Sequence, residues 1–136
     1  QLHDLTPLKT AKLQFLAVSP SSVSDLRPLS GQPIENLRLA NTRVADLRPL
    51  AGMPLVELHV QNCKSLGNLT GLETCEQLKY IILPNRQLNL DPIRKLPRLK
   101  KLRYGQPPQG SGWDDVPPVE EYWPAYDKWR RTRRFK

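Results

Sequence analysis

The sequence contains Asp25-Leu26-Arg27-Pro28-Leu29, and the same pattern returns 21 residues later as Asp46-Leu47-Arg48-Pro49-Leu50. An earlier copy, Asp4-Leu5-Thr6-Pro7-Leu8, precedes them at the same spacing, and Asn68-Leu69-Thr70-Gly71-Leu72 is a degenerate fourth copy. A fixed period of this length indicates a stack of similar structural units. Because proline fixes the backbone and has no amide hydrogen, each copy predicts a short turn or helical piece, not a long helix.

A second pattern, L-x-x-L-x-L, lies between those copies. It begins at residues 13, 34, 55, 78 and 99, so successive units are separated by 21, 21, 23 and 21 residues. Its alternating second half predicts a short strand with one face turned inward. One unit cannot bury its leucines alone, so neighbouring units must stack into a continuous core. We expect the two extra residues of the third unit to fall in loops, around 64–66 and 73–76.

The repeating unit resembles the short class of bacterial leucine-rich repeats. The matching residues follow a Leu-x-Leu pair and are Asn41-Thr42, Val44, Asp46-Leu47, Pro49-Leu50 and Gly52-Met53-Pro54-Leu55. The array is particularly similar to those attached to serine/threonine protein kinases in planctomycete-like bacteria, and Tyr122-Trp123 and Tyr126 are similar to the aromatic tail of such arrays. This resemblance implies an α/β solenoid with short parallel strands on the concave face, an irregular or short-helical convex side, and a helical C-terminal cap.

The resemblance also implies a context. Such arrays act as sensing or interaction modules, often in the extracytoplasmic domain of a membrane protein. The chain itself has no Gly-rich loop or catalytic loop of a kinase, and it begins at Gln1 in what reads as the second half of a repeat. We therefore expect a domain excised from a larger protein. Within it, we expect an array of about five units over residues 1–104, and a linker plus helical cap over 105–136.

Leucine-rich repeats commonly place Asn, Cys or Thr eight residues after the first leucine, where the side chain bonds to loop backbone. Thr42 and Cys63 occupy that position, so we expect Cys63 to be buried and structural. Cys75 falls in the convex return segment. A disulfide between the two cysteines stays open as an alternative, although two cysteines are too few for a disulfide scaffold.

Residues between the strand leucines point away from the core and onto the concave face. The resulting partner-binding candidates are Phe15, Arg38, Glu57, His59, Tyr80, Ile82, Lys101 and Arg103. Tyrosine and arginine are favoured at binding hot spots, and exposed apolar residues can mark a contact. We therefore predict a non-catalytic module that binds a protein partner. The alternative is that these side chains only cover the sheet, or meet the C-terminal tail as it folds back.

Catalytic chemistry is not indicated. The chain has two histidines, His3 and His59, and neither has metal-ligand company. We interpret His59 beside Glu57 as a solvated neighbour and not as an acid–base pair. Asp114-Asp115 lies in a Pro/Gly-rich linker that would not position two carboxylates. We therefore predict no enzyme, no cofactor, no metal and no small-molecule substrate, and the chain has no run of about 18 apolar residues that could span a membrane.

The C-terminal tail is basic and aromatic. Of the formal charge of +8, residues 98–136 carry +5, and Lys128 to Lys136 includes six basic residues and no acidic one. Trp113 is expected to pack on the last unit, and a helix is expected to start at 118–122, with Pro124 either kinking it or opening a second helix. One apolar helical face is formed by Val119, Tyr122, Trp123, Tyr126 and Trp129. We interpret this helix as a cap; nucleic-acid or anionic-membrane binding through residues 128–136 is the alternative.

Overall fold

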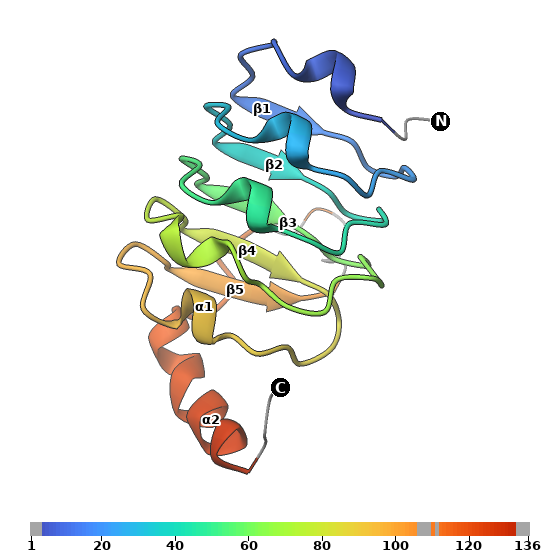
Figure 1. The fold of residues 1–136 in the computed structure, drawn as a ribbon. Coiled ribbons are helices and arrows are strands. Elements are labelled where there is room, and N and C mark those ends of the chain that lie inside the picture. The colour runs from blue at the N-terminus through green and yellow to red at the C-terminus, as the bar shows by residue number, and fades with distance from the viewer. Residues whose placement is uncertain (1–3, 106–109, 111, 133–136) are drawn as a thin grey trace.

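The computed structural model describes residues 4–105, 110 and 112–132, and the repeated units form a solenoid with one strand in each unit (Figure 1). All neighbouring strands are parallel, and they follow the chain order from β1 to β5. The strands are β1 (Phe15–Ala17), β2 (Asn36–Arg38), β3 (Glu57–His59), β4 (Tyr80–Leu83) and β5 (Lys101–Tyr104).

The strand register follows the sequence period. Leu16 is opposite Leu37, and Leu37 is opposite Leu58, at 21 residues in each step. Leu58 is opposite Ile81, 23 residues away, and the pairing of β3 with β4 continues without interruption. The two extra residues of the third unit therefore lie outside the strands, as the sequence predicted.

The convex side is formed by short helices, one in each unit. They are the 3-10 helices η1 (Thr6–Leu8), η2 (Arg27–Leu29), η3 (Arg48–Leu50) and η4 (Leu72–Thr74), and the single-turn helix α1 (Asp91–Arg94). The aspartate of each motif starts the turn: Asp46 Oδ1 accepts a hydrogen bond of 2.9 Å from the backbone N–H of Arg48. This is the short return segment that the proline motif predicts.

The core is a set of apolar columns between the sheet and the convex helices. Leu37, Leu58 and Ile81 are fully buried and in register, so each contacts its counterpart in the next unit. Burying such a side chain stabilises the fold by about 1.5–3 kcal/mol. The third apolar position of each unit is buried as well, at Val23, Val44, Leu66 and Leu88.

Both cysteines are buried and free, so the disulfide is not formed. Cys63 Sγ donates to the backbone carbonyl of Leu39 at 3.0 Å, and the hydroxyl of Thr42 donates to the same carbonyl at 2.7 Å. Cys75 Sγ donates to the carbonyl of Leu50 at 3.2 Å on the convex side. Burial raises the pKa of the Cys75 thiol to about 11, which keeps it protonated. The predicted ladder of side chains bonding to loop backbone is confirmed.

Helix α2 (Val119–Arg131) covers the last unit of the solenoid (Figure 1). Val119, Trp123 and Tyr126 are buried, while Tyr122 and Trp129 are partly buried against the same core. This is the apolar face that the spacing predicts. Pro124 lies inside the helix and does not open a second one, because α2 continues unbroken on both sides of it.

Polar contacts fix the cap to the array. The hydroxyl of Tyr126 accepts a hydrogen bond of 2.9 Å from the backbone N–H of Leu90 and lies 2.9 Å from Asp91 Oδ1, to which it donates. Arg94 forms an ion pair of 2.9 Å with Asp127, and its guanidinium carbon lies 4.5 Å from the centroid of the Trp123 ring. The helix therefore closes the end of the core with specific bonds as well as apolar contact.

Candidate functional site

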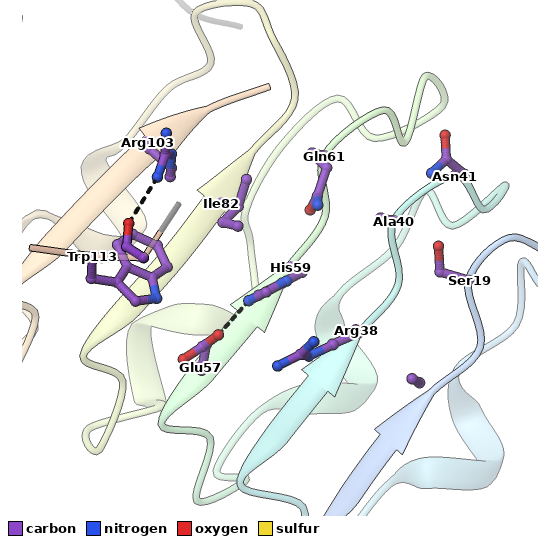
Figure 2. A pocket seen from close by; sticks show the side chains of 12 residues that line it. Ser19, Arg38, Ala40, Asn41, Glu57, His59, Gln61, Ile82, Arg103 and Trp113 are labelled. Carbon is purple, nitrogen blue, oxygen red and sulfur yellow. Dashed lines mark hydrogen bonds and ion pairs between the residues drawn. The ribbon is translucent and has the colours of Figure 1, made fainter. Parts of the chain in front are cut away.

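A hollow of about 590 Å³ lies on the concave face, the sheet face that carries the side chains between the core leucines (Figure 2). It is lined by Ala17, Ser19, Arg38, Ala40, Asn41, Glu57, His59, Gln61, Ile82, Arg103, Gly112 and Trp113. Five of the eight predicted binding residues meet there: Arg38, Glu57, His59, Ile82 and Arg103. We call this hollow the concave pocket.

A paired glutamate and histidine lie at the centre of the concave pocket. Glu57 Oε2 accepts a hydrogen bond from His59 Nε2, and the two side chains lie between Arg38 and Trp113 (Figure 2). The bond from His59 is the main cause that holds the pKa of Glu57 below its usual value, against the opposing effect of burial; the charge of Arg38 also lowers it. An ionised carboxylate only accepts, so His59 must carry its proton on Nε2.

The expectation that this pair is solvated was wrong. The side chains of His59 and Glu57 are only 13% and 19% exposed. Their neighbours in the sheet and the returning tail exclude most of the water. Because little water competes for it, the hydrogen bond between the two side chains is more strongly maintained than one at an open surface.

The returning tail forms one wall of the concave pocket. The Trp113 ring packs on the Tyr80 ring with centroids 5.1 Å apart. Lys101 Nζ donates to the carbonyl of Trp113 at 2.7 Å, and Arg103 Nη1 donates to the carbonyl of Gly112 at 3.2 Å. The chain itself therefore occupies Tyr80 and Lys101, as in the alternative in which the tail folds back onto the sheet.

Ile82 differs from its predicted exposure. We expected an exposed apolar side chain, but Ile82 is 3% exposed. The cause is non-local, since Gly112 and Trp113 cross this end of the sheet and line the same pocket. Ile82 therefore contributes to the floor of the pocket and not to an open apolar patch.

Phe15 lies on the neighbouring part of the concave face and is 54% exposed. The guanidinium carbon of Arg38 lies 5.3 Å from the centroid of its ring, within the range of a cation–π contact. Arg38 Nε also donates to Asn36 Oδ1 at 3.3 Å. These two contacts orient Arg38 at the edge of the pocket.

The solved structures that are similar to this chain include two proteins from Listeria monocytogenes. Internalin C2 has a TM-score of 0.68 and 25% sequence identity, covering 76% of this chain and 47% of the internalin. A second internalin has a TM-score of 0.53 and 22% identity, covering 76% of this chain and 38% of its own. Internalins are leucine-rich-repeat proteins. The fold is a leucine-rich repeat.

The present chain spans less than half the length of either internalin. No protein-family model and no curated protein matches it. Both structural neighbours are bacterial, in keeping with the bacterial resemblance of the repeats. The comparison supports the leucine-rich-repeat part of the sequence interpretation, and it contains nothing that bears on the attachment to a kinase.

Seven residues of the pocket lining were not among the predicted site residues, and Asn41, Gln61 and Trp113 have the largest side chains of the seven. Gln61 and Asn41 follow β3 and β2, where the leucine-rich repeat turns away from the sheet, and Asn41 adopts a positive φ of 60°. Trp113 lies far along the chain, beyond β5. Its aromatic character in a Pro/Gly-rich segment predicted that it packs on the last unit, but no local signal indicates that it reaches Tyr80.

Within residues 4–105, 110 and 112–132, no three His, Cys, Asp or Glu side chains lie close enough together to hold a metal ion. Asp114 and Asp115 are exposed and stand outside the concave pocket. None of the helices in those same ranges has the length and apolar character needed to cross a bilayer.

The sequence interpretation assigned, as its alternative, a nucleic-acid or membrane contact to the basic C-terminal segment 128–136. Residues 133–136 of this segment lie outside the described residues. Within the described part, Arg130 Nη2 forms an ion pair of 3.2 Å with Asp91 of α1. Lys128 and Arg131 are exposed. At least one arginine of this segment therefore contributes to the cap. Nothing in the comparisons supports binding of nucleic acid or membrane.

Proposed function

We propose that this chain is a non-catalytic protein-binding module that contacts its partner through the concave face. The observation that carries the proposal is the concave pocket, in which charged side chains from β2, β3 and β5 and the Trp113 ring line one hollow. A scaffold of stacked units is rigid, so these side chains are held in place before a partner arrives. Such preorganisation lowers the ordering cost of binding.

The composition of the pocket supports a protein partner. Arginine and tryptophan are enriched at binding hot spots. Here Arg38 and Arg103 stand at the edges, Trp113 forms a wall, and Phe15 extends the surface beyond the pocket. The general role as an interaction module is in keeping with the internalin neighbours. The contact residues themselves are part of the proposal.

The larger context is also part of the proposal. The resemblance of the repeats to kinase-attached arrays favours a longer protein in which this module senses or recruits, with an extracytoplasmic position as one consequence. The size of the native gene product and the presence of a kinase domain in it test this point independently of the binding site.

Affinity capture with matched variants tests the binding proposal. Wild-type chain, a concave variant (Arg38→Glu with His59→Ala) and a convex control (Arg27→Glu) are immobilised and exposed to the same extract. We expect one protein to be recovered by the wild type and the control but lost with the concave variant, because Arg27 lies on the opposite side of the solenoid. Equal recovery by all three chains would contradict the use of this face.

A further inference from the structure

Gln61 is the most unusual side chain of the concave pocket. It is 5% exposed, it lines the pocket, and its Oε1 atom is buried without a hydrogen-bond partner in the part of the chain that the structure describes. A buried amide oxygen that lacks a donor is energetically unfavourable. The side chain lines the pocket, so the oxygen gains a donor when a ligand brings an N–H or O–H group into the pocket and the amide turns toward it.

The charges of the pocket favour an anion. Its lining includes Arg38, Arg103 and Glu57. The carboxylate of Glu57 is already engaged by His59, and neither arginine forms an ion pair with a carboxylate among the described residues. Two arginines against one carboxylate leave an excess positive charge. Because guanidinium groups bind carboxylates with strong, directed hydrogen bonds, a carboxylate is the matching group.

The pocket is larger than a bare ion would fill. A volume of about 590 Å³ falls within the range of about 300–1,000 Å³ that is typical of sites for organic ligands. One wall is the Trp113 ring and part of the floor is Ile82, so the occupant also has apolar groups. A peptide segment meets all three needs, since it carries a backbone N–H, an apolar body and, at an acidic residue, a carboxylate.

We propose that the concave pocket binds an acidic side chain, aspartate or glutamate, from a loop of the partner protein. The carboxylate binds Arg38 at one edge of the pocket, and a backbone N–H of the same loop donates to Gln61 Oε1. Trp113 packs against the apolar part of the segment. This inference rests on the proposed function and specifies the chemistry that the concave face recognises.

Binding of capped tripeptides to the full chain, followed by NMR titration, tests the inference. The probes are acetyl-Ala-Asp-Ala-amide, its Asn analogue, acetyl-Ala-Ala-Ala with a free C-terminus, and sodium acetate. We expect saturable shifts of the Trp113 indole and the Gln61 amide with the Asp peptide, and at least tenfold weaker binding of the Asn analogue, because hydrogen bonds to a charged group are lost. Acetate, which has no donor for Gln61, should also bind at least tenfold more weakly.

Two variants assign the contacts. Arg38→Gln is expected to weaken Asp-peptide binding at least fivefold, whereas the convex control Arg27→Gln leaves it unchanged. Gln61→Met keeps the shape of the side chain but removes its acceptor. This variant should weaken binding of the Asp peptide at least fivefold. It should not lower the melting temperature, because the group removed is a buried oxygen that has no partner in the free protein. A purely structural Gln61 would lower stability and leave the peptide affinity alone.

The opposite results are equally clear. Equal affinity for the Asp and Asn peptides, preference for the free C-terminus, or no saturable shift at millimolar peptide would overturn the acidic side chain as the occupant. Loss of partner capture in Arg38→Glu with His59→Ala, combined with any of these results, would leave the protein-binding proposal standing and remove only the carboxylate. Capture independent of the concave face would remove both.

Discussion

Replacing Tyr126 with phenylalanine tests how the helix α2 cap is held. The substitution keeps the ring, which packs 2% exposed among Tyr122, Trp123 and Trp129. It removes one hydroxyl. That hydroxyl accepts the backbone N–H of Leu90 at 2.9 Å and donates to Asp91 Oδ1 at 2.9 Å, with Asn89 Oδ1 as a second acceptor at 3.2 Å.

The lost contacts of the hydroxyl differ in their consequence for stability. Asp91 has a side chain that is 49% exposed, so water replaces the hydroxyl at little cost. Leu90 is 0% exposed, and water does not reach its amide. A buried N–H left without an acceptor costs about 1–3 kcal/mol. For a chain of this length, each kcal/mol lowers the melting temperature by about 4 °C, so we expect a decrease of about 4–12 °C.

Thermal unfolding followed by near-UV circular dichroism measures this decrease. Tyr80→Phe is the matched control, because the Tyr80 hydroxyl makes no hydrogen bond to any residue that the structure describes while its ring packs on Trp113. We expect the control to change the melting temperature by less than about 2 °C. Equal melting temperatures for Tyr126→Phe and the wild type would refute the role of this hydroxyl in the cap.

Three further changes probe the array and the cap. Leu58→Ala, at the centre of a fully buried column, should lower the free energy of unfolding by about 2–5 kcal/mol in urea titration; a loss below about 1 kcal/mol would contradict the stacked core. Gly71→Ala should destabilise the chain far more than Gly52→Ala, although both glycines have a positive φ. A Cβ at Gly71 would lie 2.6 Å from a backbone oxygen, whereas the space at Gly52 is open. Equal urea midpoints for the two variants would contradict this. Burial raises the pKa of Tyr126 to about 12, so its contribution to stability is complete below pH 10 and is lost as the pH rises from 10 to 12. The urea midpoint of Tyr126→Phe should therefore fall less steeply than that of the wild type over this range. Parallel pH profiles of the two midpoints would exclude a contribution from Tyr126 ionisation.

The fold followed from the sequence because its signal is periodic. The leucines at fixed spacing place Leu37, Leu58 and Ile81 in one column, and the register agrees with the spacing even across the 23-residue unit. The proline motif likewise predicted the short convex helices. Each of these features depends on residues that are close in the chain, or on their copies one unit away.

The site was predicted less completely because part of it is non-local. Strand alternation placed Arg38, Glu57, His59 and Arg103 on the concave face. It could not indicate that Trp113 returns across β4 and β5, and so it overstated the exposure of Ile82. Whether a distant segment packs onto the sheet depends on tertiary contacts, and these leave no periodic pattern in the sequence.

The contact surface itself can be mapped by hydroxyl-radical footprinting of the chain alone and in complex with the captured partner. Trp113 borders the concave pocket and Trp129 packs in the cap, so Trp113 reports on contact with the concave face and Trp129 on contact with the cap. We predict that the partner protects Trp113 and Phe15 from oxidation and leaves Trp129 unchanged. Protection of Trp129 with unchanged Trp113 would instead place the partner on the cap and contradict recognition through the concave face.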